Sequence, residues 1–293
     1  MTLPTTDTTV LYPAGALGST GVVLHREELP DGRAAILLDV TAAHPVDAAW
    51  PDQPADRGTL TSGDAPDSPV ALLDAVVAAS DGSALFLGSD SPVKKGTEGW
   101  AFLVAHVVDG QSSLREGDTV TVAIDPEYRR ALSAGHTACH LASLALNRTL
   151  ADAWRKEVTT DAAGAPNFDA LAIESSTIIP DGSIDVYRIG KSLRKRGFDP
   201  ASLDDLEAIA ARVDGTLEAW VATDAAASVE SPHPVLTGRR AWVCDLPDGR
   251  VSIPCGGTHI GALDAFDAIS VSFERDDADG AITVTMRTTS TPR

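Results

Sequence analysis

Two pairs of side chains, one on an expected helix and one in a glycine-rich segment, are the residues best suited to chemistry. His136 and His140 are four residues apart, so a helix would carry both rings on one face. Cys255 and His259 have the same spacing, but the proline and glycines of segment 254–259 exclude a helix and permit a tight turn at a strand end. Thiolate and imidazole ligands select zinc over calcium or magnesium. The four residues therefore predict one zinc site.

Each pair alone also has an ordinary explanation. Two histidines at this spacing occur in protein cores and on surfaces, and a single thiol is often inert. The chain has seven His and three Cys in 293 residues, so the two pairs together favour the metal site over a chance match.

The elements that must position these residues follow from capping and periodicity. Asp125 suits an N-cap and Pro126 a first helical position, and apolar residues recur at helical spacing to Trp154. A second helix is expected from Ser202 to Trp220. Strand pairs are expected at 176–179 with 184–187, 241–246 with 251–253, and 269–274 with 282–286 across Asp279-Gly280.

The first third of the chain is expected to hold only strands. The expected segments are 21–24, 35–39, 70–77, 84–87, 100–108 and 119–124. Short strands at this spacing predict a small β-barrel or a curled sheet. With the change of composition at Asp125, the sequence predicts an α+β protein with a β-rich domain at 1–125 and a second domain at 126–293.

Composition limits the partners and the compartment. A formal charge of −19 argues against broad, sequence-independent binding to DNA or RNA. Three cysteines (Cys139, Cys244, Cys255) cannot form a disulfide framework and suit a reducing compartment. The first ten residues lack the pattern of a signal peptide, and the apolar window 70–79 is too short to span a membrane. We expect a cytoplasmic protein with no membrane or DNA partner.

Four segments resemble those of the AlaX family, free-standing relatives of the alanyl-tRNA synthetase editing domain that are more distantly related to threonyl-tRNA synthetase. HTACH at 136–140 and IPCGGTHIG at 253–261 are similar to its two signature segments. ILLDVTAAHP at 36–45 and QPADRGTL at 53–60 are similar to segments of its N-terminal domain. The resemblance covers nearly the whole chain. It implies a translation-factor-like barrel at 1–125 and a two-layer α/β editing domain with an antiparallel sheet and zinc at 126–293.

The resemblance fails at the loop from Val46 to Gln53. The family has a GGGQ loop there, whereas this chain has VDAAWPDQ, with the bulky Trp50. The residue that senses the substrate side chain would be Thr41, which is also compatible with an ordinary strand-end threonine. Gln53, Gly257 and Thr258 are the other expected substrate contacts, and Thr258 is equally compatible with stabilising its turn.

What the resemblance implies is hydrolysis of the ester between a wrong amino acid and the 3′-terminal adenosine of a tRNA. Zinc supplies a water of lowered pKa and relieves charge on the carbonyl oxygen. Four protein ligands would close a tetrahedral shell, as in structural zinc sites. Either one ligand is loose and leaves room for water, or the ion expands to five coordinates. We expect the zinc-bound water to act with one weakly held histidine among His136, His140 and His259.

One dense basic run is the expected tRNA contact. It consists of Arg188, Lys191, Arg194, Lys195 and Arg196. Arg129, Arg130, Arg239 and Arg240 would extend it. A solvated loop without a partner is the alternative. The remaining histidines, His25, His44, His106 and His233, are expected to be structural or exposed.

The leading prediction is a zinc-dependent trans-editing deacylase for serine or glycine on tRNA(Ala). A second is a specialised deacylase for a threonine-like β-hydroxy amino acid, such as fluorothreonine, on tRNA(Thr). A third, of another class, is a zinc-stabilised module that binds tRNA or a synthetase without catalysis.

Overall fold

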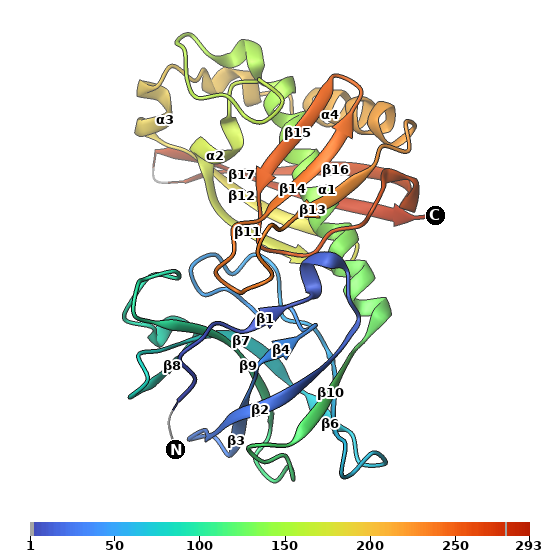
Figure 1. Cartoon of the computed structure of the whole chain (residues 1–293). Helices are drawn as coiled ribbons and strands as arrows, with labels where there is room; N and C mark the ends of the chain where they lie inside the picture. Colours follow the sequence, from blue (N-terminus) through green and yellow to red (C-terminus); the bar gives the residue numbers. More distant parts are fainter. Residues whose placement is uncertain (1–2, 279) are drawn as a thin grey trace. The chain divides into compact units, whose positions relative to one another are not determined.

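The computed structural model describes residues 3–278 and 280–293, which form two compact units (Figure 1). The first unit comprises the described residues up to Arg129 together with Glu230–Arg240 and Gly256–Thr258. The second comprises Arg130–Val229, Ala241–Cys255 and the described residues from His259 to Arg293. The described residues form a mixed α+β structure with few helices and a curled antiparallel sheet. No helix in the described part of the chain combines the length and apolar character needed to cross a membrane.

The first unit is built on one sheet with the strand order β6-β5-β10-β2-β3-β9-β7-β8, in which neighbouring strands are antiparallel. The strands are β2 (Gly18–Glu28), β3 (Arg33–Leu38), β5 (Gly58–Ser62), β6 (Val70–Leu72), β7 (Asp74–Ser80), β8 (Leu85–Leu87), β9 (Ala101–Asp109) and β10 (Thr119–Ile124). A separate parallel pair joins β1 (Thr9–Val10) to β4 (Val40–Thr41). Inward positions alternate with exposed ones along β10, as its sequence pattern predicts.

The sheet curls because β6 and β7 belong to one stretch of chain that changes partners. Leu73 alone separates them, and its N–H donates to the carbonyl of Val107. β6 pairs with β5, whereas β7 pairs with β9. The single strand expected at 70–77 is therefore divided at Leu73. A curled sheet is observed, and the alternative of a small barrel is not confirmed.

The second unit is organised around α1 (Pro126–Thr149). The Asp125 carboxylate accepts hydrogen bonds from the N–H groups of Glu127 and Tyr128 at 3.0 and 3.1 Å, which is the expected N-cap. The helix does not reach Trp154. It gives way to a short 3₁₀ turn (Ala151–Ala153), because Trp154 forms an extended bridge with Phe198.

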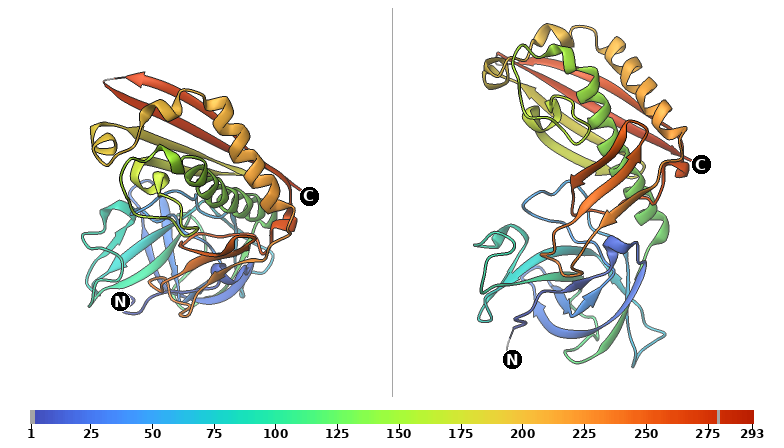
Figure 2. Two further views of the ribbon diagram at one scale, coloured as in Figure 1. Left: turned by 90° about the horizontal axis from the view of Figure 1, so that it is seen from above. Right: turned by 45° about the horizontal axis from the view of Figure 1, so that its top comes forward.

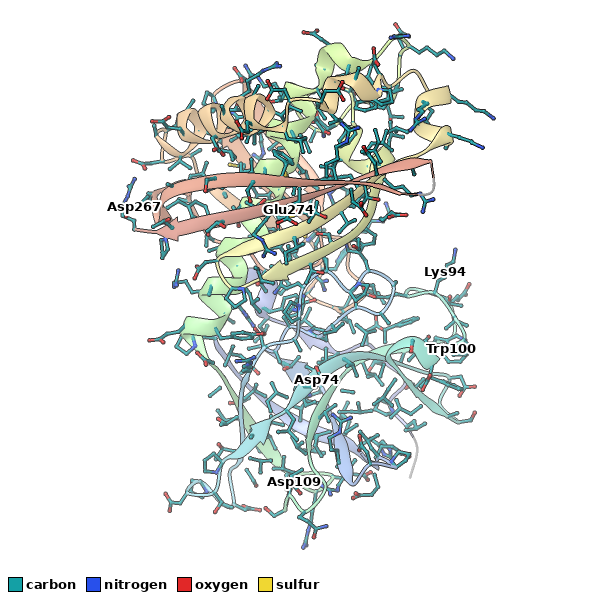
Figure 3. The ribbon with its side chains drawn as sticks, turned by 180° about the vertical axis from the view of Figure 1, so that it is seen from behind. Asp74, Lys94, Trp100, Asp109, Asp267 and Glu274 are labelled. Carbon is teal, nitrogen blue, oxygen red and sulfur yellow. The ribbon has the colours of Figure 1, made fainter. Side chains whose placement is uncertain are left out.

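Two sheets pack on opposite sides of α1 (Figure 2). One has the order β11-β12-β17-β16, with β11 (Ile173–Ile179), β12 (Gly182–Ile189), β16 (Phe266–Ala278) and β17 (Ala281–Pro292). The other has the order β13-β14-β15, with β13 (Ala227–Glu230), β14 (Ala241–Leu246) and β15 (Gly249–Pro254). The face of the larger sheet away from α1 carries polar side chains such as Glu274 (Figure 3).

The expected strand pairs form, and the hairpin strands β16 and β17 are longer than predicted. Asp279, in the expected turn between them, lies outside the described residues.

The second long helix begins later than its sequence pattern predicts. α4 (Leu206–Val221) packs on β16 and is capped by Asp205, whose carboxylate accepts from the Ala208 N–H at 2.9 Å. The expected start at Ser202 is wrong because Pro200–Leu203 forms a 3₁₀ turn of its own, capped by Asp199. The remaining helices are the short α2 (Phe168–Ala172) and α3 (Lys191–Lys195).

Gly135 sets how closely α1 approaches the larger sheet. A Cβ at this position would lie 2.5 Å from the carbonyl oxygen of Gly182 and would also strike that of Ile179. Because backbone atoms cannot move aside cheaply, the helix residue next to His136 must be glycine.

We predict that Gly135→Ala destabilises the protein by about 1–3 kcal/mol through overpacking, despite the higher helix propensity of alanine. Gly215→Ala on α4 is the matched control, since a Cβ there meets no atom within 4 Å. It should be neutral or stabilise by up to about 1 kcal/mol. Urea unfolding of both variants measures the difference, and equal free energies of unfolding would contradict the close approach.

Candidate metal centre

Four side chains of the second unit converge on one point. The ligand atoms of His136, His140, Cys255 and His259 all lie within 4.8 Å of one another. The Cys255 Sγ is 3.4 Å from His136 Nε2 and 3.3 Å from His259 Nε2. Zn–S and Zn–N bonds of about 2.3 and 2.0–2.1 Å place tetrahedral S and N ligand atoms about 3.6 Å apart. The group could therefore hold a metal ion and is compatible with zinc.

His140 is in the form that a metal ligand requires. Its Nε2 is buried and has no hydrogen-bond partner among the described residues. Burial lowers the pKa of His140 to about 4, so the ring is neutral at physiological pH. A buried polar atom without a partner is costly, and a bound cation would remove that cost.

The His140 ring is held in place by stacking. It lies parallel to the indole of Trp242 on β14, with centroids 5.2 Å apart and an interplanar angle of 14°. Trp242 is fully buried, so this wall of the site is rigid.

Thr137 orients His259. Its hydroxyl donates to the Ser133 carbonyl at 2.8 Å, and its Oγ1 lies 3.1 Å from His259 Nδ1. Because the one hydroxyl proton is used by Ser133, the Nδ1–H of His259 donates to Thr137. This tautomer leaves the lone pair of Nε2 for a metal.

Cys255 and His259 follow the end of a strand, as expected. Pro254 is the last residue of β15 and pairs with Ala241. Gly256 does not adopt a left-handed conformation, and a Cβ there would meet no atom within 4 Å. Backbone strain therefore does not explain the glycine at 256.

The first unit brings two of the expected substrate contacts together. Gln53 Nε2 donates to Thr258 Oγ1 at 2.9 Å, and Thr258 N–H donates to Gln53 Oε1 at 3.0 Å. Both side chains are buried, and Gly257 beside them is buried too. This double hydrogen bond fixes the backbone of Thr258, the residue that precedes His259 in the chain.

Thr41 is fully buried and its hydroxyl is engaged. His106 Nδ1 donates to the Ile36 carbonyl at 2.9 Å, and burial lowers the pKa of His106 to about 4. Its Nε2 is therefore an acceptor, and Thr41 Oγ1–H donates to it at 2.7 Å while accepting from Ala43 N–H at 3.0 Å. The single hydroxyl proton of Thr41 is thus already used, and only one lone pair of its oxygen remains for a substrate.

The predicted tRNA-contacting side chains are all exposed on the second unit. Arg188 lies near the end of β12, and Lys191, Arg194, Lys195 and Arg196 lie on or just after α3. Gly182, at the start of β12, packs on Gly135. Arg188 is six residues beyond Gly182, or about 20 Å of strand, so the run begins well away from the point where α1 contacts β12.

Two of the four arginines expected to extend this run do not do so. Arg129 is buried and paired with Asp56 in the first unit. Arg240 is also buried, with its guanidinium 5.3 Å from the Tyr12 ring centre. Only Arg130 and Arg239 are exposed.

Sequence reasoning missed Thr137 and Trp242 as supports of the centre. Thr137 stands between the two histidines, and its position there was a usable signal. Trp242 had none, because only the folded hairpin brings it to His140. Of the other histidines, His44 and His106 are buried, His25 bonds Glu27 and Glu116, and His233 is exposed.

Comparison with known proteins gives one partial match. The chain is similar to an alanine–tRNA ligase from Elusimicrobium minutum (strain Pei191), with 29% identity over 97 residues. The aligned part is 33% of this chain and 10% of the ligase, so the chain spans a small part of that protein. No protein-family model matches the chain. The match is consistent with a relationship to the editing domain of alanyl-tRNA synthetase and does not identify the AlaX family.

We predict that the purified protein binds one metal ion per chain and that His140→Ala or Cys255→Ser abolishes binding. The cobalt-substituted protein should show thiolate-to-metal absorption that is lost in Cys255→Ser. His25→Ala is the control, because His25 bonds glutamates of the first unit. Metal content equal to that of the wild type in both ligand variants would exclude the centre.

Thr137→Val should weaken metal binding without removing a ligand. Loss of the hydrogen bond that fixes the His259 tautomer should cost about 10–100-fold in affinity. Competition with a chromophoric chelator measures this, and an unchanged dissociation constant would show that His259 needs no support.

Proposed function

We propose that this protein is a zinc-dependent, trans-editing aminoacyl-tRNA deacylase. Its substrate would be the ester that joins a mischarged small amino acid, serine or glycine, to the 3′-terminal adenosine of tRNA(Ala). The convergence of one thiol and three imidazoles within 4.8 Å carries the proposal. The similarity to an alanine–tRNA ligase supports a tRNA substrate.

The ligand set favours zinc. One thiolate with three neutral imidazoles suits zinc better than hard cations, which prefer oxygen ligands. A zinc ion there would polarise an ester carbonyl and lower the pKa of a water molecule. The protein would hold the ion through His136, His140, Cys255 and His259.

The surrounding residues have supporting roles in this proposal. Thr137 keeps the Nε2 of His259 unprotonated, and Trp242 fixes the His140 ring. One of the three histidines would be held weakly enough to take part in proton transfer. The Gln53–Thr258 pair would set the backbone on the substrate side, and Gly257 would leave room beside it.

A threonine-like amino acid on tRNA(Thr), such as fluorothreonine, is the second candidate substrate. The structure of the 46–53 loop supports this second candidate substrate. Val46 pairs with Val76 of β7, and Asp47 pairs with Lys95, so the loop is anchored at its start. Trp50 is 51% exposed, and its side chain hydrogen-bonds the Asp52 carboxyl, whose pKa burial raises to about 6. An indole in place of the family's glycines gives this loop a different shape.

A deacylation panel tests the reaction. Wild-type protein loaded with zinc should hydrolyse at least one of the Ser-, Gly- and Thr-type esters on tRNA(Ala) or tRNA(Thr), and a chelator should stop it. A protein that binds tRNA but turns over none of these esters would be the non-catalytic module instead.

Gln53→Leu should lower kcat/KM by about 10–100-fold while metal content stays unchanged. The variant leaves the buried N–H of Thr258 without its partner, at a cost of about 1–3 kcal/mol. Gln111→Leu is the matched control, because Gln111 is exposed in the same unit. Equal loss in both variants would exclude a role for the Gln53–Thr258 pair.

Trp50→Ala should change the ratio of kcat/KM between Ser-type and Thr-type esters by about tenfold, if the loop sets the preference. Leu73→Ala serves as the control, since Leu73 is 55% exposed and lies outside the 46–53 loop. A ratio that moves no more than in the control would remove the loop from substrate selection.

A further inference from the structure

Two adjacent cavities lie in the second unit, beyond the metal centre along α1. One has a volume of about 390 Å³ and is walled by α1, the turn of the β14–β15 hairpin and the loop Ala162–Ala165. The other, about 500 Å³, lies between α1, α4 and the same turn. Arg148, Trp220 and Asp248 line both. We call the two cavities together the hairpin groove.

The lining of the hairpin groove is cationic, whereas the protein as a whole is acidic. Its lining includes three arginines, Arg148, Arg212 and Arg250, and the only acid in that described lining is Asp248. The whole chain has 42 acidic residues against 23 lysines and arginines. Guanidinium groups gathered in such a chain suit a phosphate, whose oxygens accept two hydrogen bonds from one fork.

The ion pairs of two groove arginines are easily exchanged. Arg148 pairs with Asp248, and the two side chains are 56% and 64% exposed. Arg250 lies 4.0 Å from Asp245, and these side chains are 55% and 62% exposed. Pairs this exposed stabilise a protein little. A phosphate can therefore replace Asp248 as the partner of Arg148 without a large loss of stability.

The groove also has an apolar wall. Leu144, Trp220, Leu246 and Val251 line the smaller cavity and are themselves well buried. A ring with an attached phosphate matches this combination of apolar wall and cationic rim. Unpaired nucleotides present such a ring, because their bases are free to leave the stack.

The groove lies a short distance from the metal ligands on the same two elements. On α1, Leu144 and Arg148 are one and two turns beyond His140, or about 6 and 12 Å. On β15, Val251 precedes Cys255 by four residues, or about 13 Å. At about 3.4 Å per stacked nucleotide, the longer distances of about 12 and 13 Å correspond to about four nucleotides of one strand.

From the cavity, its charge and its position, we propose that the hairpin groove binds an unpaired nucleotide of the tRNA 3′ end. Arg148 and Arg250 contact its phosphates, and the apolar wall receives its base. The inference rests on the proposed tRNA substrate and adds a second contact surface, distinct from the basic run at 188–196.

Fluorescence anisotropy with uncharged tRNA tests the groove without any hydrolysis. The variant Arg148→Gln/Arg250→Gln should bind about tenfold more weakly than the control Arg293→Gln, whose arginine is 51% exposed and also pairs with aspartates. The slope of log affinity against log salt should fall by about 1–2 relative to the wild type. A tRNA that lacks its four 3′-terminal nucleotides should bind the variant and the control equally.

The other outcomes decide between the groove proposal and the proposed function. Equal affinity of the variant and the control for intact tRNA would overturn the proposal, as would groove-dependent binding of AMP without groove-dependent binding of tRNA. If the wild type hydrolyses an ester and the groove variant behaves as the wild type does, the groove has no role and the proposed function stands. Groove-dependent tRNA binding by a protein that hydrolyses no ester would keep the groove and remove the deacylase.

Discussion

The position of α1 between two sheets is the constraint on which the second unit depends. On one side Gly135 lets the helix touch the backbone of β12, and on the other the His140 ring stacks on Trp242. The helix can therefore neither rotate nor slide without a clash or a cavity. Two imidazoles four residues apart are thereby aimed at the end of β15, where the chain supplies a thiol and a third imidazole. Burial then keeps His140 neutral, and neutral imidazole is the ligating form.

Hydrogen bonds with defined donors order each of the two units. Thr137 uses its proton on Ser133 and accepts from His259, which fixes the ring nitrogen that remains available. In the first unit, Gln53 uses both ends of its amide on Thr258. The Thr41 hydroxyl donates to His106 and accepts from the backbone N–H of Ala43. These are satisfied networks, and buried networks of this kind specify one geometry.

The charge distribution is compatible with the proposed tRNA substrate. The formal charge of −19 works against broad phosphate binding. Cations are instead gathered in small groups, namely the exposed run from Arg188 to Arg196 and the arginines of the hairpin groove. Local groups of this kind suit a substrate that presents few phosphates, such as the end of a tRNA.

Local physical chemistry was enough to predict much of the chain. The Asp125 cap, the alternation along β10 and the hairpin turns depend on neighbours in the sequence, and these elements form as expected. The ligand group was also predicted, because a helical His pair and a strand-end Cys–His pair each carry a recognisable spacing. The start of α4 was misjudged because Ser202, with Asp205 three residues on, resembles a capping box, whereas Asp199 and Asp205 each cap a turn of their own.

Tertiary structure decided what depends on residues far apart in the chain. It divided the strand at Leu73, because the pairing partner changes there from β5 to β9. It buried Arg129 and Arg240, which sequence alone had placed on a basic surface, since the burial of a cation depends on distant partners such as Asp56. It also brought Trp242 to His140 and brought together the segments that line the hairpin groove. The sequence determined which groups could bind a metal, and only the packing of α1 between its two sheets decided that they meet.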